Sequence, residues 1–442
     1  MSPVALTTNS PFGPLAGGSR LNAPRRILLV PGTLDGRNFG DASAAIVALR
    51  RLRSLWPASE VGILAERPEA MTALLPGTIP VSVDGLRARL ADWGLSGYGG
   101  GTTSMGFLAR TVARKLRLSE GTRDVVGQRF GSLLGAGGES FRRFRGELER
   151  FELIVFSGAV GFSDRFPVGS RLLLELVAMA AESRIPYVFF SHTFGPCDRP
   201  FLASRAGQAV RGAAFVAVRD PATTPGFLRR WGIGTDGIPV TGDDAVELAF
   251  ESAPEELGNA VGLNLRVANY AGSGGSLVEL LAPVVREFVR SQRTVLVPLP
   301  IAFHDGADDV GRLTEAFRHC GLAAWAPPRS PEALLADVGR CRVVVTGAYH
   351  AAVFALSEGI PTVCLTRSAF YDEKFSGLRQ LFGDGCLIVN VRRDEDVAGV
   401  GALLEEMWRG ADELRARLLE AAANQVTLSR AAWSAMANSW SR

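Results

Sequence analysis

The sequence lacks several features that would assign the protein to a class at once. No stretch approaches 18 consecutive uncharged apolar residues, so no membrane-spanning helix is expected. Five cysteines include no C-x-x-C pair, and three lie in or beside apolar strand-like runs, as is typical of reduced core residues. Residues 1–24 lack the basic start and apolar centre of a signal peptide, so we expect a flexible tail there and a cytoplasmic protein.

A charge excess of one sign is also missing. The chain carries 48 basic and 45 acidic residues, a net charge of +3. It has no platform of alternating aromatic and basic residues and no recognition-helix signature, so no nucleic-acid partner is expected. A length of 442 residues predicts two or three domains, and either half is long enough to bury a full core.

Strand-like runs alternate with helix-like segments throughout, a pattern that favours parallel sheets. The alternation forms two series without sequence repetition, separated by an acidic, proline-containing segment at 251–259. We predict an α/β protein with two doubly wound, Rossmann-like domains facing a cleft, as in the glycosyltransferase-B architecture. The expected divisions are a tail (1–24), an N-terminal domain (25–250) with an irregular insertion at about 84–150, a C-terminal domain (260–411) and a terminal helix (412–442).

Within the insertion, Met105–Leu118 contains four basic and no acidic residues. Leu108, Val112 and Leu116 follow at intervals of four, which predicts a basic amphipathic helix. One interpretation is a peripheral contact with an anionic membrane surface. The simpler one is a helix that packs its leucine face on the domain and leaves its basic face in solvent.

Candidate cleft residues in the first half follow successive predicted strands. Asn38-Phe39-Gly40-Asp41 lies between the first strand and the first helix, although the local glycine spacing is neither G-x-G-x-x-G nor a P-loop. Asp41 either caps its helix or contacts a ligand. Gly158, His192 and Arg219 come just after the next strands, so together they are expected to outline one wall of a cleft.

Candidate residues in the second half of the chain also follow predicted strands. Asn264 and Arg266 end a strand, and a guanidinium there would hold a phosphate in a bidentate manner. His304 lies near Asp308-Asp309 after the following strand. This set has no tight ligand spacing, so no metal site is expected.

The most informative stretch is Val343–Lys374. It contains a β-branched strand, a turn at Gly347, His350 in the first turn of a helix, and a second strand before Lys374. A helix N-terminus beyond the carboxyl end of a parallel strand favours an anion. His350 is therefore the leading catalytic candidate, although it could be a satisfied structural histidine. Lys374 either reaches the same cleft or forms a surface ion pair.

Taken in order, these pieces resemble the polysaccharide pyruvyltransferase family from Arg26 to about Gly383. The matching motifs are N-x-G-D at 38–41, the small residues at 157–161, Gly195-Pro196, Arg219-Asp220, and H-x-x-x-F-A-x-x-x-G-x-P beginning at His350, followed by Tyr371 and Lys374. Each motif is weak by itself, but the ordered set is fairly specific.

The resemblance implies transfer of an enolpyruvyl-derived unit from phosphoenolpyruvate, as co-substrate, to two hydroxyls of a sugar, forming a ketal without another cofactor. His350 would be the acid–base group, and Arg219, Arg266 and Lys374 the cations. The donor side of the cleft would comprise Arg219, Asn264, Arg266, Gly347 and Arg367. The acceptor side would comprise Asn38, Gly40, Asp41, Gly158, His192 and His304.

One position departs from the family pattern. Ala348-Tyr349-His350 stands where the family usually has R-L-H, so one expected guanidinium is missing. Losing such a charged hydrogen bond costs about 2 kcal/mol. Arg367 is the candidate replacement.

Two other functions remain open at this point. A glycosyltransferase would hold a sugar nucleotide in the same cleft through a helix N-terminus and backbone amides. A non-catalytic glycan-binding protein of this fold is the third alternative. The acceptor sugar, its hydroxyl pair and the oligomeric state do not follow from the sequence.

Overall fold

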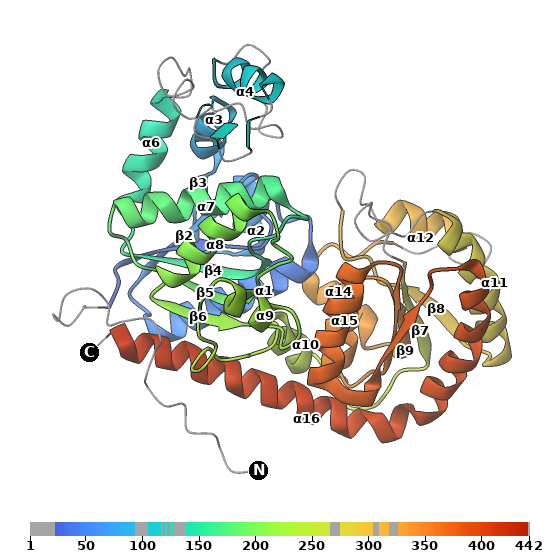
Figure 1. The fold of residues 1–442 in the computed structure, drawn as a ribbon. Coiled ribbons are helices and arrows are strands. Elements are labelled where there is room, and N and C mark those ends of the chain that lie inside the picture. The colour runs from blue at the N-terminus through green and yellow to red at the C-terminus, as the bar shows by residue number, and fades with distance from the viewer. Residues whose placement is uncertain are drawn as a thin grey trace.

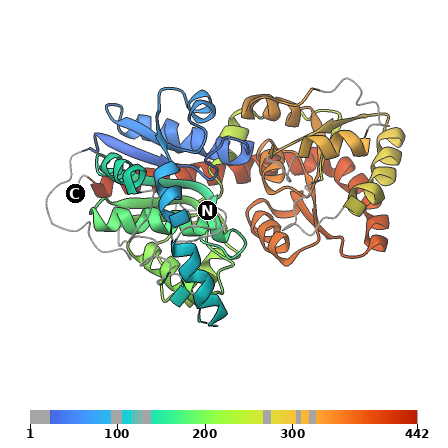
Figure 2. The same ribbon diagram turned by 90° about the horizontal axis from the view of Figure 1, so that it is seen from above.

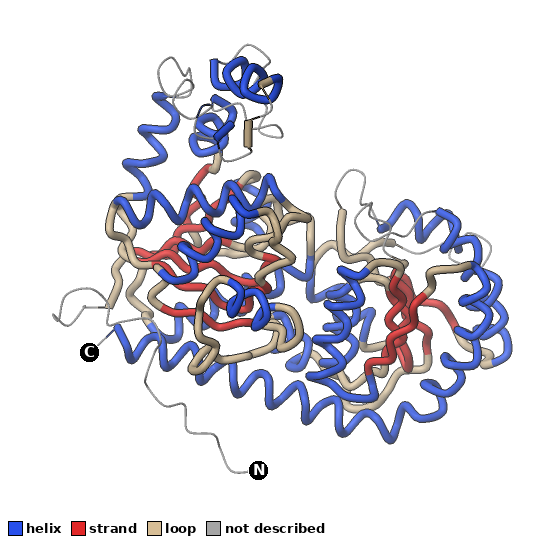
Figure 3. Tube along the Cα trace, viewed as in Figure 1, coloured by secondary structure: helices blue, strands red, loops and turns tan. Residues whose placement is uncertain are grey.

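The computed structural model describes residues 23–92, 105–116, 118–119, 122–123, 126, 138–265, 275–303, 309–317 and 326–440. These residues form two α/β domains side by side (Figure 1), each built on a parallel sheet surrounded by helices (Figure 3). The prediction of two doubly wound domains is confirmed. Arg266 and His304 lie outside the described residues.

The N-terminal sheet has six parallel strands in the order β3-β2-β1-β4-β5-β6. Its strands are β1 (Arg26–Val30), β2 (Glu60–Ala65), β3 (Ile79–Ser82), β4 (Leu153–Val160), β5 (Tyr187–Thr193) and β6 (Phe215–Val218). Its helices are α1 (Phe39–Leu55), α2 (Pro68–Leu74), α3 (Asp84–Asp92), α4 (Met105–Lys115), α6 (Gly138–Leu148), α7 (Pro167–Glu182), α8 (Pro200–Arg211), α9 (Thr224–Arg230) and α10 (Ala245–Glu251). The strand order reverses between β1 and β4, where ligands bind in sheets of this kind.

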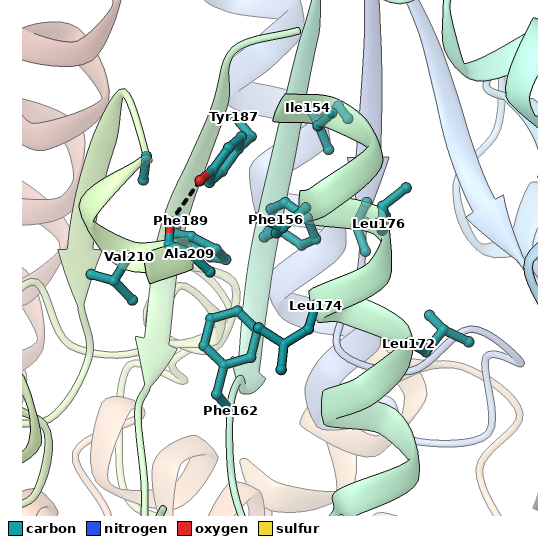
Figure 4. Packing of buried hydrophobic residues seen from close by; sticks show 14 of the residues in the cluster. Ile154, Phe156, Phe162, Leu172, Leu174, Leu176, Tyr187, Phe189, Ala209 and Val210 are labelled. Carbon is teal, nitrogen blue, oxygen red and sulfur yellow. Dashed lines mark hydrogen bonds between the residues drawn. The ribbon is translucent and has the colours of Figure 1, made fainter. Parts of the chain in front are cut away.

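The centre of this sheet is apolar on both faces, as unbroken runs such as Tyr187–Phe190 require. The rings of Phe156 and Phe189 stack with their centroids 4.9 Å apart (Figure 4). The Tyr187 hydroxyl, buried among them, donates a hydrogen bond of 2.7 Å to the carbonyl of Ala209. The strands are therefore fixed against the helices, and the loops at their carboxyl ends are held in place.

The described C-terminal sheet has five parallel strands in the order β11-β10-β9-β7-β8. Its strands are β7 (Ala260–Asn264), β8 (Val295–Pro298), β9 (Cys341–Thr346), β10 (Thr362–Thr366) and β11 (Cys386–Asn390). Its helices are α11 (Gly275–Ser291), α12 (Asp309–Phe317), α13 (Pro331–Val338), α14 (Tyr349–Ser357) and α15 (Ala369–Phe382). Here the order reverses between β7 and β9, directly before His350.

The last helix, α16 (Val400–Trp440), joins the two domains. It begins at Val400, earlier than the helix expected from residue 412, because buried Leu404 and Met407 continue its apolar face into the C-terminal core. It then runs back beneath the N-terminal domain (Figures 1 and 2). There the Trp433 ring stacks on Phe190 of β5, with centroids 3.9 Å apart and planes at 11°. The chain's end is thus packed on the first domain.

The helices of the insertion, α3, α4 and α6, stand out from the N-terminal domain at the top of Figure 1. The α3 and α6 helices pack on each other, and α4 rests on α3. Among the described helices, none combines the length and apolar character needed to cross a bilayer.

Candidate active site

A short backbone contact brings the two domains together at the site. Asn38 and Ala302 form an antiparallel bridge, and the Phe39 amide donates a 2.9 Å hydrogen bond to the carbonyl of Ile301. The Asn38 side chain accepts from the amides of Gly40 and Asp41 and thereby caps α1. Because Asn38 is the cap, the Asp41 carboxylate is available to face the other domain.

His350 lies in the first turn of α14 and packs against α1 across the domain junction. A Cβ atom added to Gly40 would lie 2.0 Å from Cγ of His350, so glycine is needed for this approach. The His350 Nε2 lies 3.6 Å from Oδ2 of Asp243 and 3.9 Å from Oδ1 of Asp41. The side chain is 10% exposed, and Nε2 is buried without a hydrogen-bond partner.

Asp243 is the site residue that sequence reasoning missed. Its side chain is 1% exposed, and its Oδ2 accepts a 2.9 Å hydrogen bond from Nη1 of Arg219. Burial by itself would raise the pKa of Asp243, but the nearby His350 and Arg219 hold it well below its usual range. Asp243 is therefore ionised. The available signal was Gly242-Asp243, just beyond Val240, which pairs with the end of β6.

The pKa of Asp41 is shifted in the opposite direction to that of Asp243. Burial raises the pKa of Asp41, while His350 and Arg219 act in the opposite direction. The two carboxyl groups on either side of His350 thus have pKa values shifted in opposite directions. Such a pair suits an acid–base site, because one group stays ionised while the other can exchange a proton.

Arg219 connects the acidic residues to an aromatic ring. Its Nε donates to Oγ1 of Thr193 at 2.9 Å, and its guanidinium lies 4.8 Å from the ring centroid of Tyr349. Among the described residues, its Nη2 has no hydrogen-bond partner. Arg219 is 2% exposed and lines the cavity, so this nitrogen can meet an anion there.

Lys374 enters the same region from α15. Its Nζ lies among three aromatic rings, 4.6 Å from the centroid of Phe370, 5.3 Å from Tyr349 and 5.6 Å from Tyr371. Cation–π contacts with these rings hold the ammonium group in this region.

The polar cluster opens into a cavity of about 660 Å³ between the domains. The lining residues that concern the chemistry are Asn38, Asp41 and Arg219 from the N-terminal domain, and Ile301, Ala348, Tyr349, His350, Tyr371 and Lys374 from the C-terminal domain. Two further cations, Arg87 and Arg165, lie in the wall contributed by the N-terminal domain. The volume is in the range of small-molecule sites and leaves room for two substrates.

Comparison with known families identifies this arrangement. A family model described as polysaccharide pyruvyl transferase matches residues 38–368, most of the chain. The chain belongs to the polysaccharide pyruvyl transferase family. The suspected family is thereby confirmed, and membership supports a transferase. Curated proteins give no match.

Solved structures place this pyruvyl transferase family member in the glycosyltransferase-B-like class. UDP-GlcNAc 2-epimerase from Neisseria meningitidis, bound to UDP-GlcNAc, is similar at a TM-score of 0.54 and 11% identity, covering 93% of this chain and 99% of that one. S. aureus MnaA with UDP is similar at a TM-score of 0.53 and 10% identity, covering 92% and 94%. At these identities the likeness concerns the fold.

Three residues predicted for the acceptor side, Gly40, Gly158 and His192, do not line the cavity, and Gly40 packs against His350 instead. His192 belongs to β5, which continues beyond Phe190 to Thr193, and its side chain is buried beside Phe189 and Phe194. Burial lowers the pKa of His192 to about 4. Gly158 lies within β4, which extends through Val160, and an added Cβ there would lie 2.6 Å from Cβ of Ala44 on α1. The carbonyl of His192 accepts a 3.1 Å hydrogen bond from the amide of Arg219, so the end of β5 supports a residue that lines the cavity.

Three residues predicted for the donor side, Asn264, Gly347 and Arg367, are also absent from the cavity lining. Asn264 is fully buried and donates to the Leu299 carbonyl at 2.6 Å and to Asp309. The Gly347 amide donates to the carbonyl of Asn264, which ties the ends of β7 and β9 together. Arg367 is half-buried and is not among the lining residues. Within the described ranges, no group of three His, Cys, Asp or Glu side chains is arranged to hold a metal.

Proposed function

We propose that this protein transfers a pyruvyl group from phosphoenolpyruvate to two hydroxyls of one sugar, forming a ketal and releasing phosphate. The supporting observation is the buried, unpartnered Nε2 of His350 between two carboxyl groups, on a cavity that also receives Arg219 and Lys374. A proton carrier and cations around one space are what this reaction needs.

The reaction balances without a cofactor or a metal. A proton adds to the methylene carbon of phosphoenolpyruvate, and the oxygen of one hydroxyl bonds to the neighbouring carbon. The carbon–oxygen bond to phosphate then breaks, and the second hydroxyl oxygen bonds to the same carbon. The two hydroxyls release two protons. One replaces the proton given to the methylene carbon, and the other leaves with phosphate or to solvent.

In this scheme His350 moves the protons. It delivers one to the methylene carbon while ionised Asp243 stabilises its positive form from 3.6 Å. Asp41, whose pKa is raised by burial, accepts a proton from an attacking hydroxyl. Arg219 and Lys374 bind the carboxylate and phosphate of the donor.

The alanine at position 348 changes which residues are available to neutralise the negative charge of the donor. Ala348 is buried and lines the cavity at the N-cap of α14. With no guanidinium there, we assign part of the phosphate's neutralisation to Arg165 across the cavity. Among the described residues, the Arg165 guanidinium has no ion-pair partner, so its charge is available.

The chain's two lysines make a direct test possible. Lys374 lines the cavity, and Lys115, at the end of α4, is exposed. Phosphoenolpyruvate should protect Lys374 from an amine-reactive label while leaving Lys115 fully reactive, as read by peptide mass spectrometry. Calorimetry should show that Lys374→Ala weakens phosphoenolpyruvate binding by about tenfold or more, the effect of losing a charged hydrogen bond. Lys115→Ala is the matched control.

The same labelling experiment with a sugar nucleotide tests the alternative function. Protection of Lys374 by UDP-GlcNAc and not by phosphoenolpyruvate would reject the pyruvyl donor and make the protein a glycosyltransferase. Glycan binding with no protection by either donor would indicate a binding protein that has kept the fold.

A further inference from the structure

The α4 helix exposes an apolar face. Val112 and Leu116, one helical turn apart, are 56% and 66% exposed, and Leu118 just beyond the helix is 39% exposed. Among the side chains of α4 whose exposure is described, Ala113 is buried, and the helix rests on α3. Two of the three apolar positions in the sequence pattern, Val112 and Leu116, are therefore not packed on the domain; the side chain of Leu108 is not described.

This exposure is concentrated in one place. The described part of the chain has seven large apolar side chains with high exposure, and three of them are in this short segment. The other four are single residues on separate elements, at Ile79, Val168, Val295 and Leu428. Scattered apolar side chains are ordinary on protein surfaces, whereas a clustered set indicates a binding surface.

The same segment is basic. Residues 105–118 contain four basic and no acidic residues, and Arg114 and Lys115 are exposed. Neither forms an ion pair with an acidic side chain of the described residues. Apolar side chains flanked by unpaired cations match the chemistry of an anionic lipid surface, where acyl chains lie beneath phosphates.

We propose that α4 binds the surface of an anionic lipid bilayer, inserting Val112, Leu116 and Leu118 and placing Arg114 and Lys115 at the phosphates. The bound surface would lie beside the cavity, because α3, on which α4 rests, contributes Arg87 to the cavity wall. Lipid binding is independent of pyruvyl transfer, and either can fail without the other.

The test is co-sedimentation of the full chain with vesicles of phosphatidylcholine alone or mixed with phosphatidylglycerol. Binding is expected only to the mixed vesicles and should weaken with salt. The double variant Val112→Asp/Leu116→Asp should reduce partitioning by at least about tenfold. Leu428→Asp, which changes an exposed leucine 45% accessible on α16, is the matched control and should bind normally.

A second readout identifies the surface that is bound. Mixed vesicles should protect Lys115 from the amine-reactive label and leave Lys374 reactive. The proposal is overturned if mixed vesicles do not bind the protein, or if both variants bind equally well. It is also overturned if size exclusion shows a self-associated chain that the double variant dissociates while vesicles bind nothing, because the face would then belong to a second copy.

Discussion

Two adjacent aspartates, Asp243 and Asp244, are both buried at the domain junction but take part in different structures. Asp243 does not itself line the cavity but contacts two residues that do, Arg219 and His350, and these keep it ionised. Asp244 points toward α16 and accepts a 2.7 Å hydrogen bond from the Ser429 hydroxyl. Burial raises the pKa of Asp244 to about 6, although Arg51 and Ser429 oppose that shift.

The surroundings of Asp244 form a second polar cluster without a cavity residue. Arg51 of α1 bonds to Ser429 and Glu247, and Arg430 also bonds to Glu247. This cluster fastens α16 to α1 and α10. The comparison teaches that a buried carboxylate alone does not indicate function; its contacts with side chains that line a cavity do.

The largest expected effect is a difference in activity between variants of the two aspartates. Asp243→Asn should lower kcat by about 10³-fold, within the range for lost acid–base assistance. It should also lower the free energy of unfolding by about 3 kcal/mol, because Arg219 would remain buried without its partner. Asp244→Asn should keep kcat within a few-fold. Phosphate release from phosphoenolpyruvate and urea unfolding measure the two quantities. Equal loss of kcat in both variants would contradict the distinction.

The α16 attachment should affect stability rather than chemistry. Trp433→Ala removes the ring stacked on Phe190 and should cost about 4 kcal/mol of unfolding free energy, as for other large-to-small core changes. The kcat of the remaining folded protein should be nearly unchanged. Leu428→Ala, at an exposed position of the same helix, should alter neither quantity. A large loss of kcat per folded molecule would show that α16 helps to form the site.

The pH dependence of stability should also distinguish the aspartates. The folded pKa of Asp244, about 6, lies above its ordinary value of 3.8, so the folded state holds a proton that the unfolded state has lost. Stability should therefore fall by up to about 3 kcal/mol as pH rises through this window. The pKa of Asp243 is shifted downward instead. The stability that its ionised form contributes is therefore lost only as pH falls below the ordinary pKa of an aspartate. Urea unfolding at about pH 4.5 and about pH 7.5 should show the slope, and Asp244→Asn should flatten it.

The smallest of these effects tests the placement of His350. Gly40→Ala puts a Cβ atom 2.0 Å from Cγ of the His350 ring, so the ring must shift. We expect kcat to fall by about 10²-fold, the usual effect of a misplacement near 1 Å. Gly146→Ala on α6, where an added Cβ meets nothing within 4 Å, is the control. Unchanged kcat in Gly40→Ala would mean that catalysis does not depend on the observed position of the His350 ring.

The sequence predicts the architecture because strand and helix periodicities alternate cleanly. It also places His350 and Lys374 on the cavity, since the ends of β9 and β10 meet at one sheet edge. Asp243 escaped prediction because Val240 forms only an isolated bridge, too short to indicate a strand. His192 lies off the cavity lining because β5 continues through polar residues that tertiary packing buries. The positions of Asp243 and His192 depend on contacts between residues that are far apart in the sequence, which a local pattern does not reveal.

The central claim is that the His350 cluster carries out pyruvyl transfer. The most direct measurement is release of inorganic phosphate from phosphoenolpyruvate with a panel of hexose acceptors, with ketal formation followed by mass spectrometry. The wild type should release one phosphate for each ketal formed, His350→Gln should be slower by at least about 10²-fold, and Asp244→Asn should match the wild type. Undiminished turnover in His350→Gln, or transfer from a sugar nucleotide with none from phosphoenolpyruvate, would contradict the account.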